Sequence, residues 1–138
     1  MSGPALKHVD SHAAIHEAAL NEAAELTELL DKLVKDGHVE KALEVAFVTV
    51  EHWETRTLRH ADSEEEGLYK ELAEADPSLK DSIVELTRDH NLLRLLVAEI
   101  RTLLDQGTVN DYIVQRFQAL IIVDELHNRS EEKILPDH

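Results

Sequence analysis

Two segments of the sequence share the pattern His-x-x-Ser-Glu-Glu-x-x-Leu, one beginning at His60 and the other at His127. In each segment a histidine precedes a glutamate by four residues, as His60 precedes Glu64 and His127 precedes Glu131. Residues four apart lie on one face of an α-helix, so each pair can direct an imidazole and a carboxylate toward one point. Both groups are ligands of transition-metal cations, and the repeated pattern therefore predicts metal binding.

A further histidine comes one helix before each copy of the pattern, His12 before the first copy and His90 before the second. Each half of the chain therefore supplies one histidine and then a His-x-x-x-Glu pair, and two copies of a ligand set predict two cations. The predicted metal ligands are His12, His60, Glu64, His90, His127 and Glu131. His16, one turn after His12, is a reserve candidate, and the sequence leaves open whether it replaces or joins His12.

Three breaks divide the chain into helical segments. Asp36-Gly37 has the form of a helix end, where glycine can adopt the left-handed conformation, and Asp76-Pro77 has the form of a helix start. A third break falls at 105–108. The segments between them, roughly 5–35, 39–75, 77–104 and 109–134, are rich in helix formers and lack the alternation of strands. Short connections between long helices predict an all-α, up-down-up-down antiparallel four-helix bundle, with residues 1–138 as one domain.

The predicted ligands lie on the apolar stripes of these helices. In the segment 77–104 the stripe is an unbroken aliphatic series except for His90. The ionisable residues on the three later stripes are His60, Glu64, His90, Asp124, His127 and Glu131. The stripe of the first segment can be drawn in two ways, through Ile15 and Leu29 or through His16 and Leu30, and both pass through His12.

Burial of these groups requires a compensating charge. An uncompensated buried carboxylate costs several kcal/mol, which is a large part of the ~5–15 kcal/mol by which a domain is stable. No lysine or arginine occupies an equivalent stripe position, so bound cations are the expected compensation. Four histidines and two carboxylates without sulfur suit non-haem iron, with manganese or zinc as alternatives. If both glutamates bridge two ions, coordination positions stay open for a bridging oxygen and a small ligand.

Counting residues from the turns tests whether the ligands lie at one depth in the bundle. His60, Glu64 and His90 are nearly equidistant from Asp76 and therefore lie at one level. About Gly107 the count is less even, because His90 lies 17 residues before it and His127 lies 20 residues after it. The loop geometry has to absorb this mismatch of about one helical turn.

The order of these residues resembles that of the hemerythrin-like domains, which are also called HHE cation-binding domains. The runs Glu64–Tyr69 and Glu131–Pro136 are similar to that family's Glu-Glu-x-x-Leu-Phe-Pro signature, and the resemblance covers the whole chain. It implies a non-haem di-iron site, two iron ions (Fe2+/Fe3+) with a bridging oxo or hydroxo group, inside a four-helix bundle. It also implies binding or turnover of O2, hydrogen peroxide or nitric oxide, or iron sensing and the repair of iron centres.

The chain departs from the oxygen-carrying hemerythrins at two places. Those proteins have a His-x-x-x-His pair on the third helix, whereas here the residue four after His90 is Arg94. Their fourth helix supplies an aspartate at a longer spacing than that from His127 to Glu131. These departures favour peroxide-consuming, catalase-like chemistry over reversible oxygen carriage. The alternative is a module for iron, oxygen or nitric oxide sensing, iron storage or iron-centre repair, without turnover.

Composition excludes several other classes of function. The 29 Asp and Glu residues outnumber the 14 Lys and Arg residues, and a formal charge of −15 argues against binding to nucleic acid or to an anionic membrane surface. The chain has no cysteine, which excludes disulfides and thiolate metal sites. No apolar run is long enough to cross a membrane, and the first residues lack the apolar stretch of a secretory signal. A cytoplasmic protein is therefore expected. The sequence does not identify its redox partner.

The remaining polar residues near the stripes receive simpler predictions. Asp124 could accept a hydrogen bond from a ligand imidazole. Glu65 is expected to point away from the ligand face. Tyr69 could approach the mouth of the site, but a role in packing is favoured. His38 and His52 are expected to face solvent or a turn.

Overall fold

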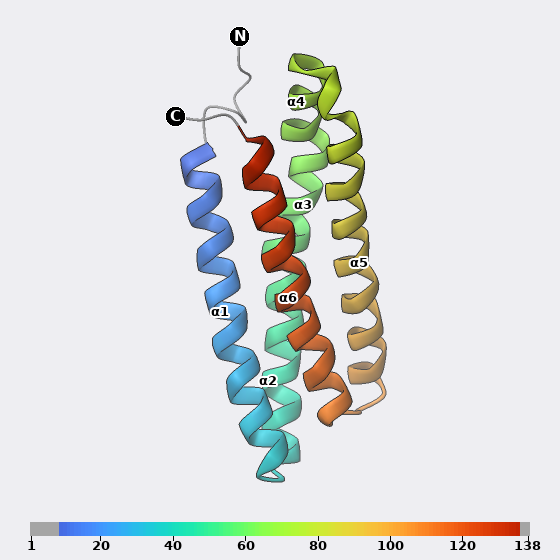
Figure 1. Cartoon of the computed structure of the whole chain (residues 1–138). Coiled ribbons are helices and arrows are strands. Elements are labelled where there is room, and N and C mark those ends of the chain that lie inside the picture. The colour runs from blue at the N-terminus through green and yellow to red at the C-terminus, as the bar shows by residue number, and fades with distance from the viewer. Residues whose placement is uncertain (1–8, 136–138) are drawn as a thin grey trace.

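The computed structural model describes the backbone of residues 9–135 and the side chains of residues 13–135 (Figure 1). Its elements are α1 (Val9–Lys35), α2 (Val39–His52), η2 (Trp53–Leu58), α3 (Arg59–Ser63), η3 (Glu64–Leu68), α4 (Tyr69–Ala75), η4 (Pro77–Leu79), α5 (Lys80–Asp105) and α6 (Asp111–Ile134). From α2 to α4 the helix is continuous, and η2 and η3 are π-helical turns within it. We call this continuous helix the second rod, residues 39–75. The predicted helical segments are therefore confirmed to within two residues wherever their ends are described.

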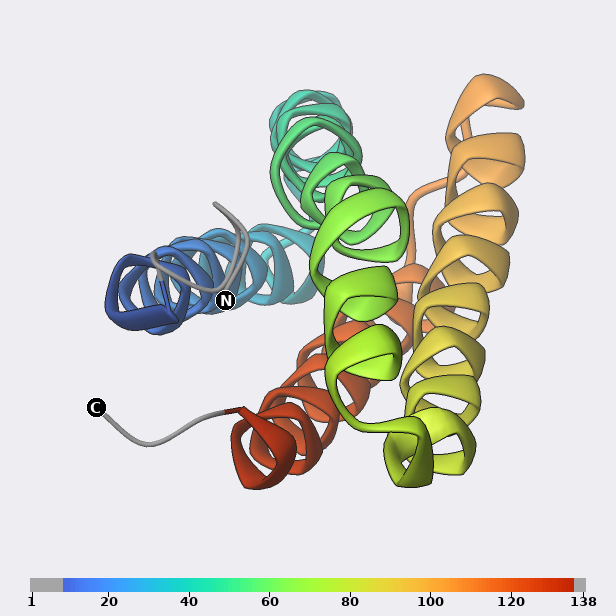
Figure 2. The same cartoon turned by 90° about the horizontal axis from the view of Figure 1, so that it is seen from above.

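The four rods of the structure, α1, the second rod, α5 and α6, form an antiparallel up-down-up-down bundle, which confirms the predicted fold. Seen from above, α1, the second rod, α5 and α6 follow one another around the bundle, and α6 returns beside α1 (Figure 2). Residues 9–135 contain no β-strand. Within the same range, no helix combines the length and the apolarity that crossing a membrane requires.

The turns between the rods follow the sequence signals. Gly37 and Gly107 have φ angles of +76° and +77°, the left-handed conformation that glycine adopts without strain. An Oδ1 atom of Asp76 accepts hydrogen bonds from the backbone N–H of Ser78 at 3.0 Å and from its hydroxyl at 2.6 Å. Asn110, which the sequence reading did not single out, caps α6 by accepting from the backbone N–H of Ile113 at 3.2 Å.

The loop between α5 and α6 removes the mismatch in depth between His90 and His127. Its centre lies just beyond Gly107, because α5 ends at Asp105 and α6 begins at Asp111. His90 lies 15 residues before the end of α5 and His127 lies 16 residues after the beginning of α6. The two histidines therefore reach the same level of the bundle.

Two apolar clusters fill the interior and leave a polar layer between them. The larger cluster, around Trp53, Leu93 and Phe117, extends toward the turns at Gly37 and Gly107. The smaller cluster, at the other end, consists of Leu68, Tyr69, Leu72 and Leu86 with partly buried neighbours. On α5, buried His90 lies between Leu86 of the small cluster and Leu93 of the large one. The bundle thus surrounds the predicted metal ligands with apolar side chains above and below.

Of the two stripes that α1 could bury, the structure contains the one through His16. Ala19, Ala23 and Leu30 of that stripe are buried. The alternative stripe is wrong, because Ile15 and Leu29 are 52% and 45% exposed. The side chain of His12 lies outside the described residues, and its metal-ligand role stays a prediction.

Candidate metal centre

Four buried side chains from three rods converge in the polar layer. Glu64 of the second rod, His90 of α5, and His127 and Glu131 of α6 each place one potential ligand atom within 4.8 Å of the others. Each is at most 3% exposed. The Nε2 atom of His90 lies 3.1 Å from Oε1 of Glu64, and that of His127 lies 3.3 Å from Oε2 of Glu131. We call these four residues the inner cluster.

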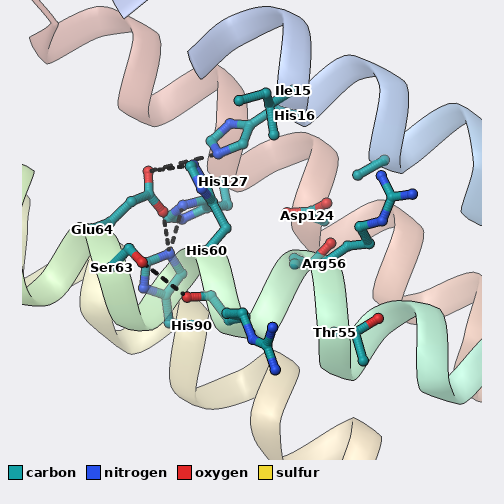
Figure 3. Close-up of a pocket in the computed structure, with 13 residues that line it drawn as sticks. Ile15, His16, Thr55, Arg56, His60, Ser63, Glu64, His90, Asp124 and His127 are labelled. Carbon is teal, nitrogen blue, oxygen red and sulfur yellow. Dashed lines mark hydrogen bonds and ion pairs between the residues drawn. The ribbon is translucent and has the colours of Figure 1, made fainter. Parts of the chain in front are cut away.

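A second group, the outer cluster, consists of His16, His60 and Glu64. The Nε2 atoms of His16 and His60 lie 3.7 and 4.0 Å from Oε2 of Glu64. The two imidazoles meet edge to face, with ring centroids 4.8 Å apart, and they are 15% and 24% exposed. Figure 3 shows the imidazoles of both clusters and Glu64 directed toward one another from all four rods.

The two buried glutamates connect the clusters. Glu64 turns Oε1 toward His90 and Oε2 toward His16 and His60. Glu131 turns Oε2 toward His127 and Oε1 toward His16, at 3.7 Å. Each carboxylate therefore directs one oxygen to the inner cluster and one to the outer cluster. Two cations bridged by carboxylates require this arrangement.

Tyr69 lies at the inner cluster, although packing was the favoured prediction for it. Its hydroxyl donates a hydrogen bond to Oε2 of Glu131 at 2.5 Å and lies 3.4 Å from Nε2 of both His90 and His127. Burial, followed by the charges of Glu64 and Glu131, raises the pKa of the Tyr69 phenol far above its usual value. The hydroxyl therefore stays a proton donor in the metal-free protein.

The π-helical turn η3 explains why Tyr69 faces the cluster. In an α-helix, residues five apart point to different sides, so a tyrosine five residues after Glu64 is expected to leave the ligand face. A π turn is wider and pairs residue i with residue i+5, which brings the two onto one side. Glu64 and Tyr69 are both buried because η3 spans the interval between them.

Carboxylates outside the clusters hold the far edges of the two buried imidazoles. Nδ1 of His90 donates to Oε2 of Glu65 at 2.8 Å, and Nδ1 of His127 donates to Oδ2 of Asp89 at 3.0 Å. The prediction that Glu65 points away from the ligands is therefore wrong, since η3 turns it onto His90. Asp89, rather than Asp124, accepts the hydrogen bond from His127.

These hydrogen bonds make the inner cluster suitable for a cation. The Nε2 atoms of His90 and His127 lie 3.1 Å apart. Two ring nitrogens at this distance need a hydrogen on one of them, or a bound cation, because two lone pairs would repel each other. Burial lowers the pKa of His127. The hydrogen bond and charge of Glu131 and the hydrogen bond to Asp89 outweigh that effect and raise the pKa to about 9. The metal-free protein thus holds a proton where a cation can bind.

Cation binding is therefore expected to release about one proton per chain at neutral pH, because the imidazolium of His127 must lose its Nε2 hydrogen. The apparent affinity should rise about tenfold per pH unit and become constant above the His127 pKa of about 9. Titration of the metal-free protein with Zn2+ in weakly buffered solution, followed with a pH indicator, measures the release. Equal affinity on both sides of that pKa would show that the proton is not displaced.

A cavity of about 270 Å³ leads to the outer cluster. Residues of α1, η2, α3, η3, α5 and α6 line it (Figure 3). Its lining includes His16 and His60 of the outer cluster, Glu64, His90 and His127 of the inner cluster, and Asp124. Asp124 is buried on the stripe of α6, and burial raises the pKa of its carboxyl to about 6. The cavity gives a small molecule space beside the outer imidazoles, next to a carboxyl that can exchange a proton near neutral pH.

The two other histidines of the prediction lie apart from the clusters. His38 is exposed at the turn before α2, as expected. The expectation for His52 is wrong, because its Nε2 lies 3.0 Å from the backbone carbonyl of Ala19 and its side chain is only 9% exposed. It connects the second rod to α1.

The geometry agrees with the comparison to known families. The sequence pattern of the hemerythrin HHE cation-binding domain matches residues 8–136. The chain belongs to this family. Comparison with the curated proteins found no significant match, and neither did comparison with the solved structures. Membership in a cation-binding family and a buried cluster of imidazoles and carboxylates together support a metal site, and the donor set fits iron.

Proposed function

We propose that this HHE domain holds two iron ions and uses them to decompose hydrogen peroxide or to react with O2. The observation that carries the proposal is the pair of buried glutamates, each of which directs one carboxylate oxygen toward the inner cluster and the other toward the outer cluster. The proposed ligands are His12, His16, His60, Glu64, His90, His127 and Glu131, with an oxo or hydroxo group between the ions. When bound, two iron ions would supply electrons to, or accept them from, a small oxygen-containing ligand.

The chain's own residues prepare the site for such a ligand. Apolar side chains of the two core clusters limit entry of water from above and below, whereas the cavity opens toward the outer imidazoles. The Tyr69 hydroxyl and the Asp124 carboxyl can each hold a proton, at the inner cluster and in the cavity respectively. Peroxide decomposition needs proton donors beside the metals, and these two groups meet that requirement.

The test uses protein loaded with iron and freed of excess metal. Metal analysis should find about two iron ions per chain, and added peroxide should be consumed with one O2 released for every two peroxide molecules. Metal-free protein is the control. Loaded protein that leaves peroxide and O2 unchanged would contradict the proposal, and a spectral response to O2 or nitric oxide without consumption would indicate sensing instead. Protein that takes up no metal would be a structural bundle.

Replacing His90 with alanine is expected to lower iron occupancy by at least half, because its Nε2 lies at the centre of the inner cluster. His38→Ala is the matched control, since His38 is exposed in the turn before the second rod, more than 20 residues before His60. Metal analysis of both variants after identical loading gives the comparison. Equal occupancy in the two variants would contradict the ligand assignment.

The proposal that His16 joins His12 in the outer site has its own test. The two residues lie one turn apart on α1 and hence on one face of the helix. His16→Ala and His12→Ala are each expected to weaken binding of one iron by about tenfold or more while the other ion stays bound. Chelator competition measures both. A His16→Ala variant with wild-type affinity would leave His12 as the α1 ligand.

A further inference from the structure

The imidazole of His90 is contacted at both of its nitrogens and on one face of the ring. Adjacent glutamates of η3 contact both nitrogens, Glu64 at Nε2 and Glu65 at Nδ1, at 3.1 and 2.8 Å. The ring of Tyr69 lies parallel to the imidazole, with centroids 5.5 Å apart and an interplanar angle of 6°. The orientation of His90 therefore depends on where Glu65 is placed.

Arg94 binds Glu65 and two further side chains near it. Its Nη2 donates to Oε2 of Glu65 at 2.8 Å and to Oδ1 of Asp62 at 2.7 Å, and its Nη1 donates to Oδ1 of Asn91 at 3.0 Å. The same Oε2 atom of Glu65 accepts from His90. Arg94, Glu65 and His90 thus form a hydrogen-bonded chain from the half-exposed surface of α5 to the inner cluster.

Charge explains why this position holds an arginine. Glu65 stands between Glu64 and Glu66 and close to Asp62, in a chain with a formal charge of −15. Without the guanidinium of Arg94, repulsion from the neighbouring carboxylates would favour turning the 28% exposed Glu65 side chain outward, away from His90. A planar guanidinium can bind two carboxylates at once, which the point charge of a lysine does less well.

We propose that Arg94 is a positioning residue of the metal site, which acts through Glu65 to keep the Nδ1 hydrogen and the ring orientation of His90 and so to present Nε2 to the inner cation. The inference rests on the proposed metal site. In the described part of the chain, Asp89 holds His127 without an ion pair to an arginine or a lysine. Arg94 should therefore affect His90 and leave His127 unchanged.

The first arm of the test is the affinity for Zn2+, measured by chelator competition. Glu65→Gln should weaken binding of one cation by about 10- to 100-fold, the usual effect of removing a carboxylate that supports a ligating histidine. Arg94→Gln should cause a smaller loss, about threefold to tenfold, and Arg94→Lys should restore part of it. Arg129→Gln, which removes an exposed arginine paired with Glu125, is the control and should change nothing.

A double-mutant comparison separates action through Glu65 from independent action. If Arg94 works through Glu65, the Glu65→Gln, Arg94→Gln double variant should bind Zn2+ as Glu65→Gln does, within about twofold. Additive losses would overturn the inference. Wild-type affinity in Arg94→Gln would overturn it as well.

The second arm of the test detects the Nδ1 hydrogen of His90 by NMR. Zinc-loaded protein is diamagnetic, and proton NMR with 15N-labelled histidine should show exchange-protected Nδ1–H signals for His90 and His127. Arg94→Gln should shift or broaden the His90 signal alone, whereas Asp89→Asn should affect the His127 signal alone. An unchanged His90 signal in Arg94→Gln overturns the inference. Wild-type protein that binds neither zinc nor iron would remove the proposed function, which is a separate outcome.

Discussion

Glu64→Ala is expected to reduce the bound iron from about two ions per chain to fewer than one. Oε1 of Glu64 lies 3.1 Å from Nε2 of His90, and its Oε2 lies 3.7 Å from Nε2 of His16, so the substitution removes an oxygen from both clusters at once. It also removes one of the two buried negative charges that attract the cations. A loss of more than about 100-fold in affinity follows, because each site loses a charged ligand.

The control for this variant is Glu66→Ala, which changes an exposed glutamate two residues away in the same π turn. Its occupancy should equal that of the wild type. Metal-free Glu64→Ala should be at least as stable as the metal-free wild type, because a buried carboxylate without a cation is destabilising. Two ions retained in Glu64→Ala would show that the glutamate does not connect the clusters.

Removal of the metal is expected to produce the largest change in stability. The folded metal-free protein buries Glu64 and Glu131 beside His90 and His127, with the proton of His127 as partial compensation. Cations are expected to bind this arrangement much more tightly than the unfolded chain. At a free concentration 1,000 times the dissociation constant, each ion would stabilise the fold by about 4 kcal/mol.

Thermal unfolding followed by circular dichroism, with and without a strong chelator, measures the effect. The melting temperature should fall by about 25–30 °C on removal of both ions and recover when iron is added back. Glu64→Ala serves as the control, since a variant that holds fewer than one ion per chain should show a much smaller difference between the two conditions. An unchanged melting temperature in the wild type would contradict metal-linked folding.

The features that the sequence predicted well are those that depend on helical periodicity. The stripe of α5 has His90 as its buried polar member, and the stripe of α6 buries Asp124, His127 and Glu131, as the spacing indicates. The turns at Gly37 and Gly107 fall at predicted breaks, and Gly37 has the predicted left-handed backbone, which glycine adopts without strain. Such local signals, together with the family pattern, were sufficient for the bundle and for the burial of Glu64, His90, His127 and Glu131.

Other features arise only where the chain leaves the 3.6-residue period or where distant segments meet. The π turn η3 brings Tyr69 and Glu65 onto His90, and a reading based on α-helical spacing places both elsewhere. The stripe of α1 depended on which face its neighbours cover, and the hydrogen bonds of Arg94 with Glu65 and of Asp89 with His127 join residues 29 and 38 positions apart. Spacing along one helix carries no information about these contacts, because the packing of one rod against another sets them.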